Sequence, residues 1–487
     1  MSDLDYIILF SDKAFENFEE FNTKVTTEIS SFKKPLRFTG RYDSRADLLH
    51  ITKEKVDSIL SRLTFDHFEI FLNSKSVEAT ELIFSSLLQH DTLTRFMIIF
   101  QEDVPFLKKI AASWIEEKKT LDVLHISIKT KDTTFNVDLA RAIQTKPMIS
   151  SLALFNLVLP NSFFEGFMDY ISSSTTLKIF WISYDVTHVT NPSTIFSVLE
   201  KNRFVKNIFF GDCNFQTKDI PFFVHAVKRN TIAISLRLRE ARDNVLIVPA
   251  LETLADHPTI KTFKIESFRN RLRHDSNLSI IPYDILLPKL QTLRILEVNA
   301  KCFKNVEEFK LFTTGLRNNT SIEGLTITGN IFWTFNVPSL LDALCFNTTL
   351  QKLSLPNSVV HSHAYPFLEK LLSVNFTLAI LELRSLRISK NLLSIMENNF
   401  TLFKIKARLS ERGEVSNHSQ LKEYLHRNQK IEFLKTATLF ELLFPRMKRS
   451  ERIDRLLSEQ LAKKREKRAR AEISQSCSSS DSVISLD

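Results

Sequence analysis

One short pattern of polar and apolar positions recurs along most of the chain. A polar residue and two spacers precede an apolar anchor, and apolar residues follow at +3 and +5; Asn347 to Leu355, with anchor Leu350, shows it clearly. Six consecutive intervals between anchors, from Phe65 to Ala233, are each 28 residues long, and a fixed period of this kind is the signature of a repeat protein. The anchors are Phe65, Leu93, Leu121, Ile149, Leu177, Val205, Ala233, Ile260, Leu293, Ile322, Leu350, Leu378, Leu402 and Ile431.

Each repeat predicts one strand and one helix. The residues at +3 and +5, such as Leu124 and Ile126, point to the same side of a strand because side chains alternate along it. Between the strands, amphipathic segments such as Phe367 to Leu372 predict helices. One strand and one helix cannot bury their apolar side alone, so neighbouring repeats must stack.

The segment Ala343 to Leu355 follows the ALxxNxTLxxLxL arrangement of leucine-rich repeats of the ribonuclease-inhibitor-like class. The chain resembles that class over most of its length. The resemblance implies an α/β solenoid, a horseshoe with parallel strands on the concave face and helices on the convex face. The usual asparagine after the strand and the glycine before the helix are mostly missing. The fold hosts many unrelated activities, so it does not identify a function.

The pattern divides the chain into four segments. Residues 1–64 form an N-terminal cap or degenerate repeats, and residues 65–445 form the solenoid, closed by a C-terminal cap helix. Residues 446–472 predict a basic amphipathic helix, and residues 473–487 a disordered serine-rich tail.

Side chains at +2, +4 and +6 are expected to point out of the concave face. In the first half they are apolar, and because strands lie about 4.8 Å apart they should form a nearly continuous patch. Such a patch marks a partner site, unless the phase is locally shifted or an internal segment covers the patch. The expected contacts are Phe71, Met97, Ile99, Val123, Phe155, Ile179, Trp181 and Phe209.

The same concave positions become basic farther along, at Arg237, Arg239 and Lys264. These side chains either form a solvated polar face or contact an acidic partner.

The end of the chain carries most of the excess charge. Residues 446–470 hold eleven Lys/Arg and four Asp/Glu, a net charge of +7, whereas residues 1–445 carry 54 Lys/Arg and 49 Asp/Glu. Nucleic acid is therefore expected to bind through the tail only, if at all. The cluster is either a nuclear import signal, a contact for nucleic acid or acidic surfaces, or a solvated helix. The import-signal residues are Lys448, Arg449, Lys463, Lys464, Arg465, Lys467 and Arg468.

No catalytic motif stands out. The chain has seven glycines and lacks glycine-rich phosphate loops, its four cysteines form no CxxC, and His361 and His363 lack a third ligand nearby. We therefore expect neither an enzyme nor a bound cofactor or metal. The N-terminus has no secretory signal pattern and no segment predicts a membrane span. The expected location is cytoplasmic, or nuclear if the tail acts as an import signal.

These features favour a monomeric scaffold that binds a protein partner on its concave face. The alternative enzyme-linked role is a GTPase regulator, since the repeats are similar to those of Ran GTPase-activating proteins. Their acidic C-terminal segment is absent here, and no catalytic arginine or asparagine of that family can be placed. The remaining alternative is nucleic-acid or acidic-surface binding through the basic tail.

Overall fold

The computed structural model describes the repeats and leaves gaps between several of them. The described residues are 6–10, 38–43, 57, 65–72, 77–100, 105–128, 133–156, 158–183, 192–211, 215–240, 245–267, 280–303, 305–329, 336–359, 362–386, 389–402, 404–409 and 419–429. The predicted cap helix before Pro445, the basic helix and the serine-rich tail lie outside them.

The chain divides into two compact units, and the first contains Met1–Val205. Its strands β1 to β7 lie side by side in chain order, and each pair is parallel. The elements are β1 (Tyr6–Phe10), β2 (Phe38–Asp43), β3 (Phe65–Leu72), α4 (Val77–Leu88), β4 (Arg95–Phe100), α5 (Pro105–Glu117), β5 (Val123–Ile128), α6 (Thr133–Gln144), β6 (Ser151–Phe155), α7 (Asn161–Ser173), β7 (Ile179–Ser183), η2 (Pro192–Phe196) and α8 (Ser197–Lys201).

The second unit contains Lys206–Ile453. Its strands β8 to β15 follow the same parallel order. The elements are β8 (Asn207–Gly211), η3 (Thr217–Asp219), α9 (Ile220–Arg229), β9 (Ser235–Glu240), α10 (Ile247–Leu254), β10 (Thr262–Ser267), α11 (Tyr283–Leu286), η4 (Leu287–Lys289), β11 (Ile295–Asn299), η5 (Ala300–Cys302), α12 (Val306–Asn318), β12 (Gly324–Thr328), α13 (Asn336–Leu344), β13 (Lys352–Val359), η6 (Ser362–Ala364), α14 (Tyr365–Val374), β14 (Ile380–Leu386), α15 (Lys390–Asn398) and β15 (Lys404–Leu409).

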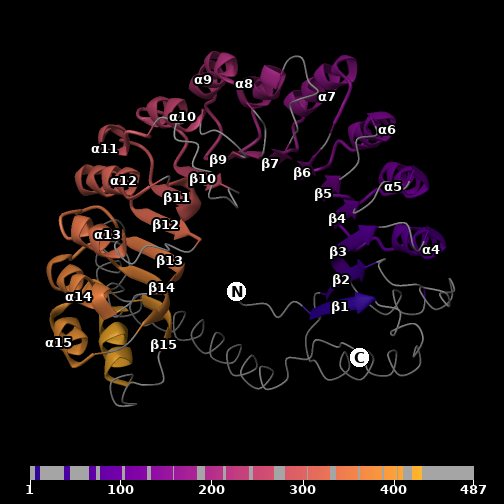
Figure 1. The fold of residues 1–487 in the computed structure, drawn as a ribbon. Helices are drawn as coiled ribbons and strands as arrows, with labels where there is room; N and C mark the ends of the chain where they lie inside the picture. Colours follow the sequence, from indigo (N-terminus) through magenta and orange to yellow (C-terminus); the bar gives the residue numbers. More distant parts are fainter. Residues whose placement is uncertain are drawn as a thin grey trace, which may run out of the picture. The chain divides into compact units, whose positions relative to one another are not determined.

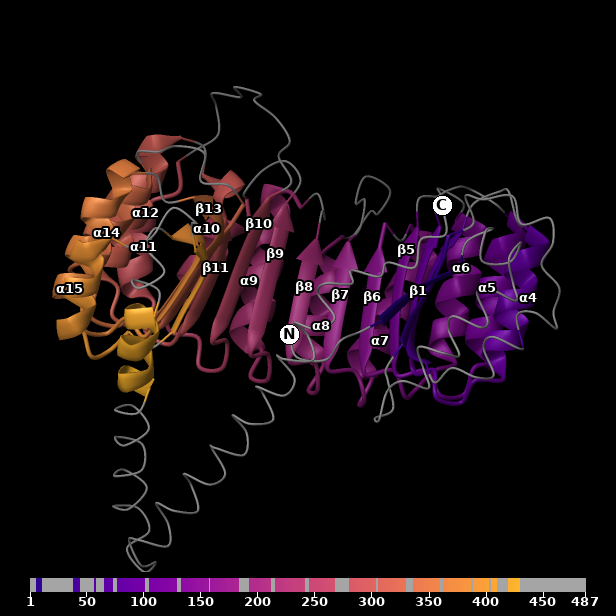
Figure 2. The ribbon, with the colours of Figure 1, turned by 90° about the horizontal axis from the view of Figure 1, so that it is seen from below.

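Within each unit the helices cover one face of the parallel sheet (Figure 1). The opposite face, here called the open face, carries no helix among the described residues, and Figure 2 shows the strands side by side behind the helix layer. This alternation of parallel strands and helices is a leucine-rich repeat solenoid, so the predicted fold class is confirmed.

The core lies between each strand and the helix that follows it. Residues at +3 and +5, such as Leu124, Ile126, Phe263 and Ile265, are at most 1% exposed. Side chains at +2, +4 and +6 therefore point to the open face, because neighbouring residues of a strand alternate between faces.

The polar residue three positions before the anchor joins each repeat to the one before it. The Asn347 amide nitrogen donates hydrogen bonds to the carbonyl oxygens of Leu316 (2.7 Å) and Asn319 (3.1 Å) in the previous repeat. Its amide oxygen accepts from the backbone nitrogens of Thr349 (3.0 Å) and Leu350 (2.8 Å). This asparagine ladder satisfies backbone groups that the turn would otherwise bury without partners. Equivalent asparagines are Asn202, Asn230, Asn319, Asn375, Asn399 and Asn428.

Other residue types occupy the ladder position elsewhere. Lys118, 2% exposed, donates from Nζ to the carbonyl oxygens of Leu87 (3.2 Å) and His90, and burial lowers its pKa below the ordinary value. His257 is 3% exposed, and its Nδ1 accepts from the Ile260 backbone nitrogen at 3.2 Å. Since that nitrogen can only donate, the His257 proton lies on Nε2, 2.9 Å from the Val227 carbonyl oxygen.

The stability of the second unit is expected to depend on pH through His257. Burial, together with the charge of Lys261, lowers the pKa of His257 below 6.5, so the unfolded chain binds the proton more readily. Stability should fall as pH drops below 6.5, by up to about 1.4 kcal/mol per pH unit, until the folded-state pKa is passed. Urea unfolding between mildly acidic and neutral pH measures this. His257→Asn, which restores the ladder asparagine, should flatten the profile; identical profiles for both proteins would contradict the prediction.

Candidate functional site

The open face of the first unit brings together residues from four successive strands. The parallel register places Met97, His125, Ala153 and Trp181 in one row across β4 to β7. A second row, two residues further along each strand, contains Ile99 and Phe155. The spacing of one repeat therefore converts positions 28 residues apart in sequence into neighbours on one surface.

Three rings form a contiguous cluster at the centre of this face, here called the ring platform: His125, Phe155 and Trp181. The His125 and Trp181 rings stack with centroids 6.0 Å apart and planes 19° apart, and the Phe155 ring meets Trp181 edge-on at 6.5 Å. His125 and Trp181 come from strands on either side of β6, so their rings lean together over that strand. Ala153 of β6 is accordingly 1% exposed, and its small side chain leaves room for the stack.

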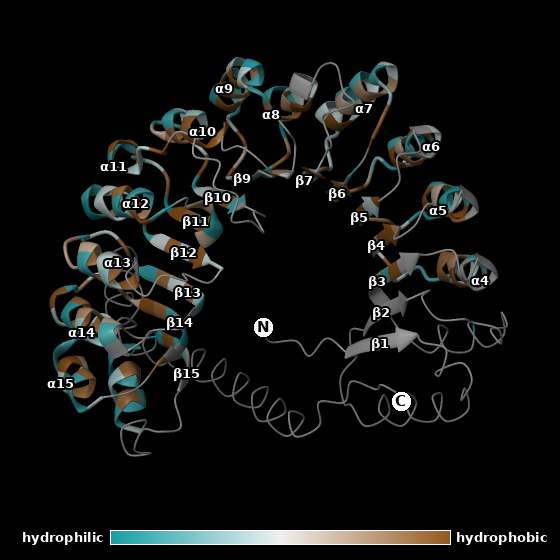
Figure 3. Ribbon diagram, in the orientation of Figure 1, coloured by the Kyte–Doolittle hydropathy of each residue, from teal (hydrophilic) through white to brown (hydrophobic). Residues whose placement is uncertain are grey.

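Apolar side chains surround the ring platform. Met97, Ile99, Val123 and Ile179 are all half-buried at open-face positions, as are Phe155 and Trp181. Figure 3 shows β4 and β6 of this unit largely in brown, the colour of hydrophobic residues, whereas β13 of the second unit alternates between brown and teal. The open face of the first unit is thus mainly apolar at the described strands, with an aromatic centre.

The open face of the second unit has a different chemistry, and its basic residues are paired. Arg237 lies 2.5 Å from the Glu266 carboxylate, and Lys264 lies 3.3 Å from Glu266 and 2.8 Å from Glu297. Arg239 is half-buried on the same face. The expected basic surface is therefore largely balanced by acidic residues of β10 and β11. The sequence interpretation considered the basic residues without these neighbours on the next strands.

Phe209 departs from the expectation of an exposed contact. It is 1% exposed, and the Arg237 guanidinium carbon lies 4.4 Å from the centre of its ring. A position facing away from the helices is therefore not always accessible, because a long side chain on the next strand can cover an aromatic ring. We do not include Phe209 among the partner contacts below.

Several predicted residues lie beyond what the structure describes. Phe71 is placed on β3, but its side chain is outside the described set. The import-signal residues Lys448, Arg449, Lys463, Lys464, Arg465, Lys467 and Arg468 are also outside it, so the tail interpretations stay predictions.

Two solved structures are similar to this chain. The crystal structure of the Rad7 and Elc1 complex in yeast shares 13% identity at a TM-score of 0.38, covering 83% of this chain and 86% of that chain. The leucine-rich repeat-containing protein LegL7 from Legionella pneumophila shares 12% identity at a TM-score of 0.30, covering 71% of this chain and 93% of its own. No protein-family model matches the chain, and no curated protein matches it. The function is therefore argued from the chain's own residues.

The sequence interpretation missed two members of the central row. His125 and Ala153 occupy the +4 positions of their repeats, but neither is a large apolar residue. The signal was present in the spacing, because a small residue exactly one repeat from a ring on each side permits the rings to meet. Among the described residues, no group of three His, Cys, Asp or Glu side chains is arranged to hold a metal. None of the described helices is both long enough and apolar enough to cross a membrane.

Proposed function

We propose that this protein is an interaction scaffold that binds a protein partner on the open face of its first unit. The observation that carries the proposal is the ring platform, an aromatic cluster held on a rigid sheet and flanked by half-buried apolar side chains. Aromatic residues at the centre of an apolar surface are the usual anchors of protein interfaces. A partner with a matching apolar surface would remove this area from water.

The proposed contacts are those of the described open face. Trp181 and Phe155 serve as anchors, His125 supports the Trp181 ring, and Ala153 acts only by leaving space beneath them. The surrounding contacts are Met97, Ile99, Val123 and Ile179. The paired residues Arg237, Lys264 and, beside them, Arg239 would orient a partner rather than attract an acidic one, since Glu266 and Glu297 balance the charge.

The repeat period supports placing the chain in the ribonuclease-inhibitor-like class. Six successive repeats of 28 residues leave room for a full helix between strands, and helices such as α5, with 13 residues, occupy that room. We infer this subclass from the repeat itself.

The function is tested by quantitative affinity capture with the intact chain and with Trp181→Asp. A charge at the centre of the apolar surface should reduce recovery of the direct partner by at least about tenfold. Ala153→Leu should cause the same loss, because leucine at this position would hold the His125 and Trp181 rings apart. A partner cannot touch Ala153 itself, so that loss would report the arrangement of the rings.

Met148→Asp is the matched control. Met148 is 66% exposed on a turn of the same unit and lies outside the open face, so its replacement should leave recovery unchanged. A chain ending at Pro445 tests the tail. A partner retained by Trp181→Asp and Ala153→Leu but lost on truncation would sink the scaffold proposal in this form and assign binding to the tail.

A further inference from the structure

A second exposed apolar surface lies on the helix-to-strand turns of the second unit. Its members, here called the turn ridge, come from three successive repeats that contain α13, α14 and α15. They are Phe346 (50% exposed), Val374 (48%), Phe376 (59%) and Phe400 (47%). Exposed apolar side chains that gather in consecutive repeats differ from the isolated ones found on any protein surface.

The earlier repeats of this unit show that the turn does not require apolar residues. Phe346 and Val374 lie four residues before their anchors, and Phe376 and Phe400 lie two residues before theirs. The equivalent exposed positions in preceding repeats hold Arg229, Thr231, Asp256, Pro258, Lys289, Gln291, Asn318, Thr320 and Thr348. The apolar character therefore begins at Phe346 and is a local feature of these turns.

Two arginines lie over rings of the turn ridge, and they differ in their hydrogen bonds. The Arg427 guanidinium carbon is 4.3 Å from the centre of the Phe400 ring, and its nitrogens donate to the carbonyl oxygens of Met396 (3.0 Å) and Glu397 (2.9 Å). The Arg317 guanidinium carbon is 3.8 Å from the centre of the Phe346 ring. Arg317 is exposed, and among the described residues its side chain has no ion pair or hydrogen bond.

Arg317 is thus a positioned cation whose N–H donors are available. Stacking on Phe346 restricts the planar guanidinium without using the donors at its edge. A carboxylate accepts two parallel hydrogen bonds from such an edge. The chemistry that complements the turn ridge is therefore an acidic side chain beside apolar ones.

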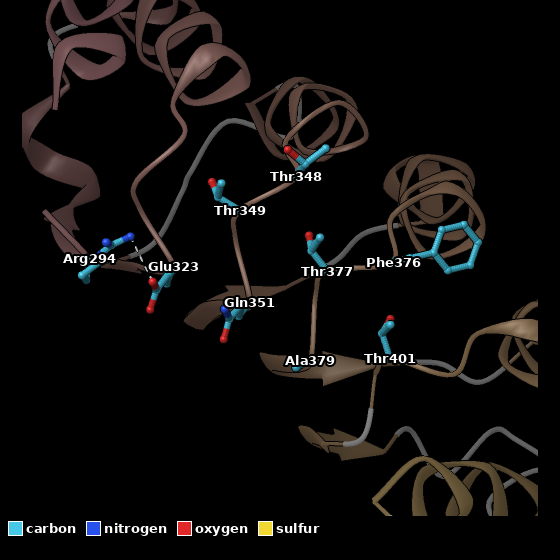
Figure 4. A pocket seen from close by; sticks show the side chains of 9 residues that line it. All are labelled: Arg294, Glu323, Thr348, Thr349, Gln351, Phe376, Thr377, Ala379 and Thr401. Atoms are coloured by element: carbon cyan, nitrogen blue, oxygen red, sulfur yellow. Dashed lines mark ion pairs between the residues drawn. The ribbon is translucent and has the colours of Figure 1, made fainter. Parts of the chain in front are cut away.

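A groove extends along the same turns. It has a volume of about 400 Å³ and includes Phe376 of the turn ridge. In Figure 4, the Arg294–Glu323 ion pair (3.1 Å) lies at one end, Phe376 lies toward the other, and threonine side chains lie between them. The hydroxyls and the Gln351 amide can hydrogen-bond to a polypeptide backbone. The lining residues are Arg294, Glu323, Thr348, Thr349, Gln351, Phe376, Thr377, Ala379 and Thr401.

We propose that the turn ridge and this groove form a second docking surface, for an acidic, apolar peptide segment of a partner protein. The segment's apolar side chains cover Phe376 and its neighbours, and a carboxylate pairs with Arg317. This site is separate from the ring platform and does not depend on it. The partner is defined by its chemistry, which is a carboxylate within an apolar stretch.

The test uses the full chain and two dye-labelled, acetylated synthetic peptides in fluorescence anisotropy. One peptide carries Phe-Leu pairs separated by glutamates, and the other has lysines in place of the glutamates. The acidic peptide should bind at least about tenfold more tightly than its lysine counterpart. Phe376→Ala and Arg317→Glu should each weaken binding of the acidic peptide by about tenfold or more.

The controls separate this surface from others. Phe222→Ala removes a phenylalanine that is 56% exposed on α9 and should leave binding unchanged, as should Trp181→Asp. Unchanged circular dichroism of each variant establishes that it is folded. The proposal is overturned if the acidic peptide does not bind, if both peptides bind equally, or if folded Phe376→Ala and Arg317→Glu bind like the parent chain. Loss with Trp181→Asp alone would assign the peptide to the ring platform.

Discussion

Replacing Gly315 with alanine is expected to destabilise the second unit by about 3 kcal/mol. Gly315 lies on α12 against the backbone of α11, and an added Cβ would collide with the Tyr283 carbonyl oxygen and lie 2.9 Å from its carbon. The Leu287 Cβ would be 3.1 Å away on the same side. Two of these atoms belong to backbone, so the collision can be relieved only by moving the helices apart. Equilibrium urea unfolding followed by circular dichroism measures the loss.

Gly166 provides a matched control with the opposite sign. It also lies inside a helix, α7, but a Cβ built on it would meet nothing within 4 Å. Gly166→Ala should stabilise the first unit by about 0.5–1 kcal/mol, because alanine loses less backbone entropy in a helix than glycine. Equal effects of the two substitutions would contradict the close approach of α11 and α12.

Replacing Asn319 with alanine is expected to cost about 3 kcal/mol in the free energy of unfolding. The Asn319 amide donates to the Leu287 carbonyl oxygen at 2.6 Å and accepts from the Ser321 and Ile322 backbone nitrogens at 3.0 and 2.7 Å. Alanine would leave these buried backbone groups without partners. Because each ladder residue joins two repeats, hydrogen exchange should also accelerate in α11 and α12.

Asn318 is the neighbouring control for this substitution. It is exposed at the end of α12, one residue before the ladder position. Asn318→Ala should change stability by less than about 0.5 kcal/mol, as is usual at exposed sites. Similar losses for both variants would show that the effect comes from the helix end and not from the asparagine ladder.

The periodic apolar pattern was sufficient to predict the fold and the direction of strand side chains. Leu124 and Ile126 are buried and Val123 and His125 are half-buried on the other face, as alternation along a strand requires. Repetition makes this inference robust, since each repeat applies the same local rule to the same positions. The polar residue of the pattern was also visible, as Asn347 shows, but its hydrogen bonds to the preceding repeat were not.

Side chains on the open face required the tertiary structure. Phe155 and Phe209 both sit at apolar open-face positions, yet Phe209 is covered while Phe155 meets Trp181 in a half-buried cluster. Arg237 explains the difference at Phe209, because its guanidinium both lies over the ring and pairs with Glu266. These contacts depend on which residues occupy the neighbouring strand and on the rotamers that they adopt.

The sequence by itself determined the repeat, its period, the alternation of strand and helix, and the residues that form the core. These follow from local periodicity, which the hydrophobic effect enforces at every repeat. Only the tertiary structure decided that His125 and Trp181 stack over Ala153, that Gly315 is required beside α11, and that Arg317 lies over Phe346 with its donors available. The reason is that contacts between repeats join side chains far apart in the chain, and their accessibility depends on packing geometry that no single repeat contains.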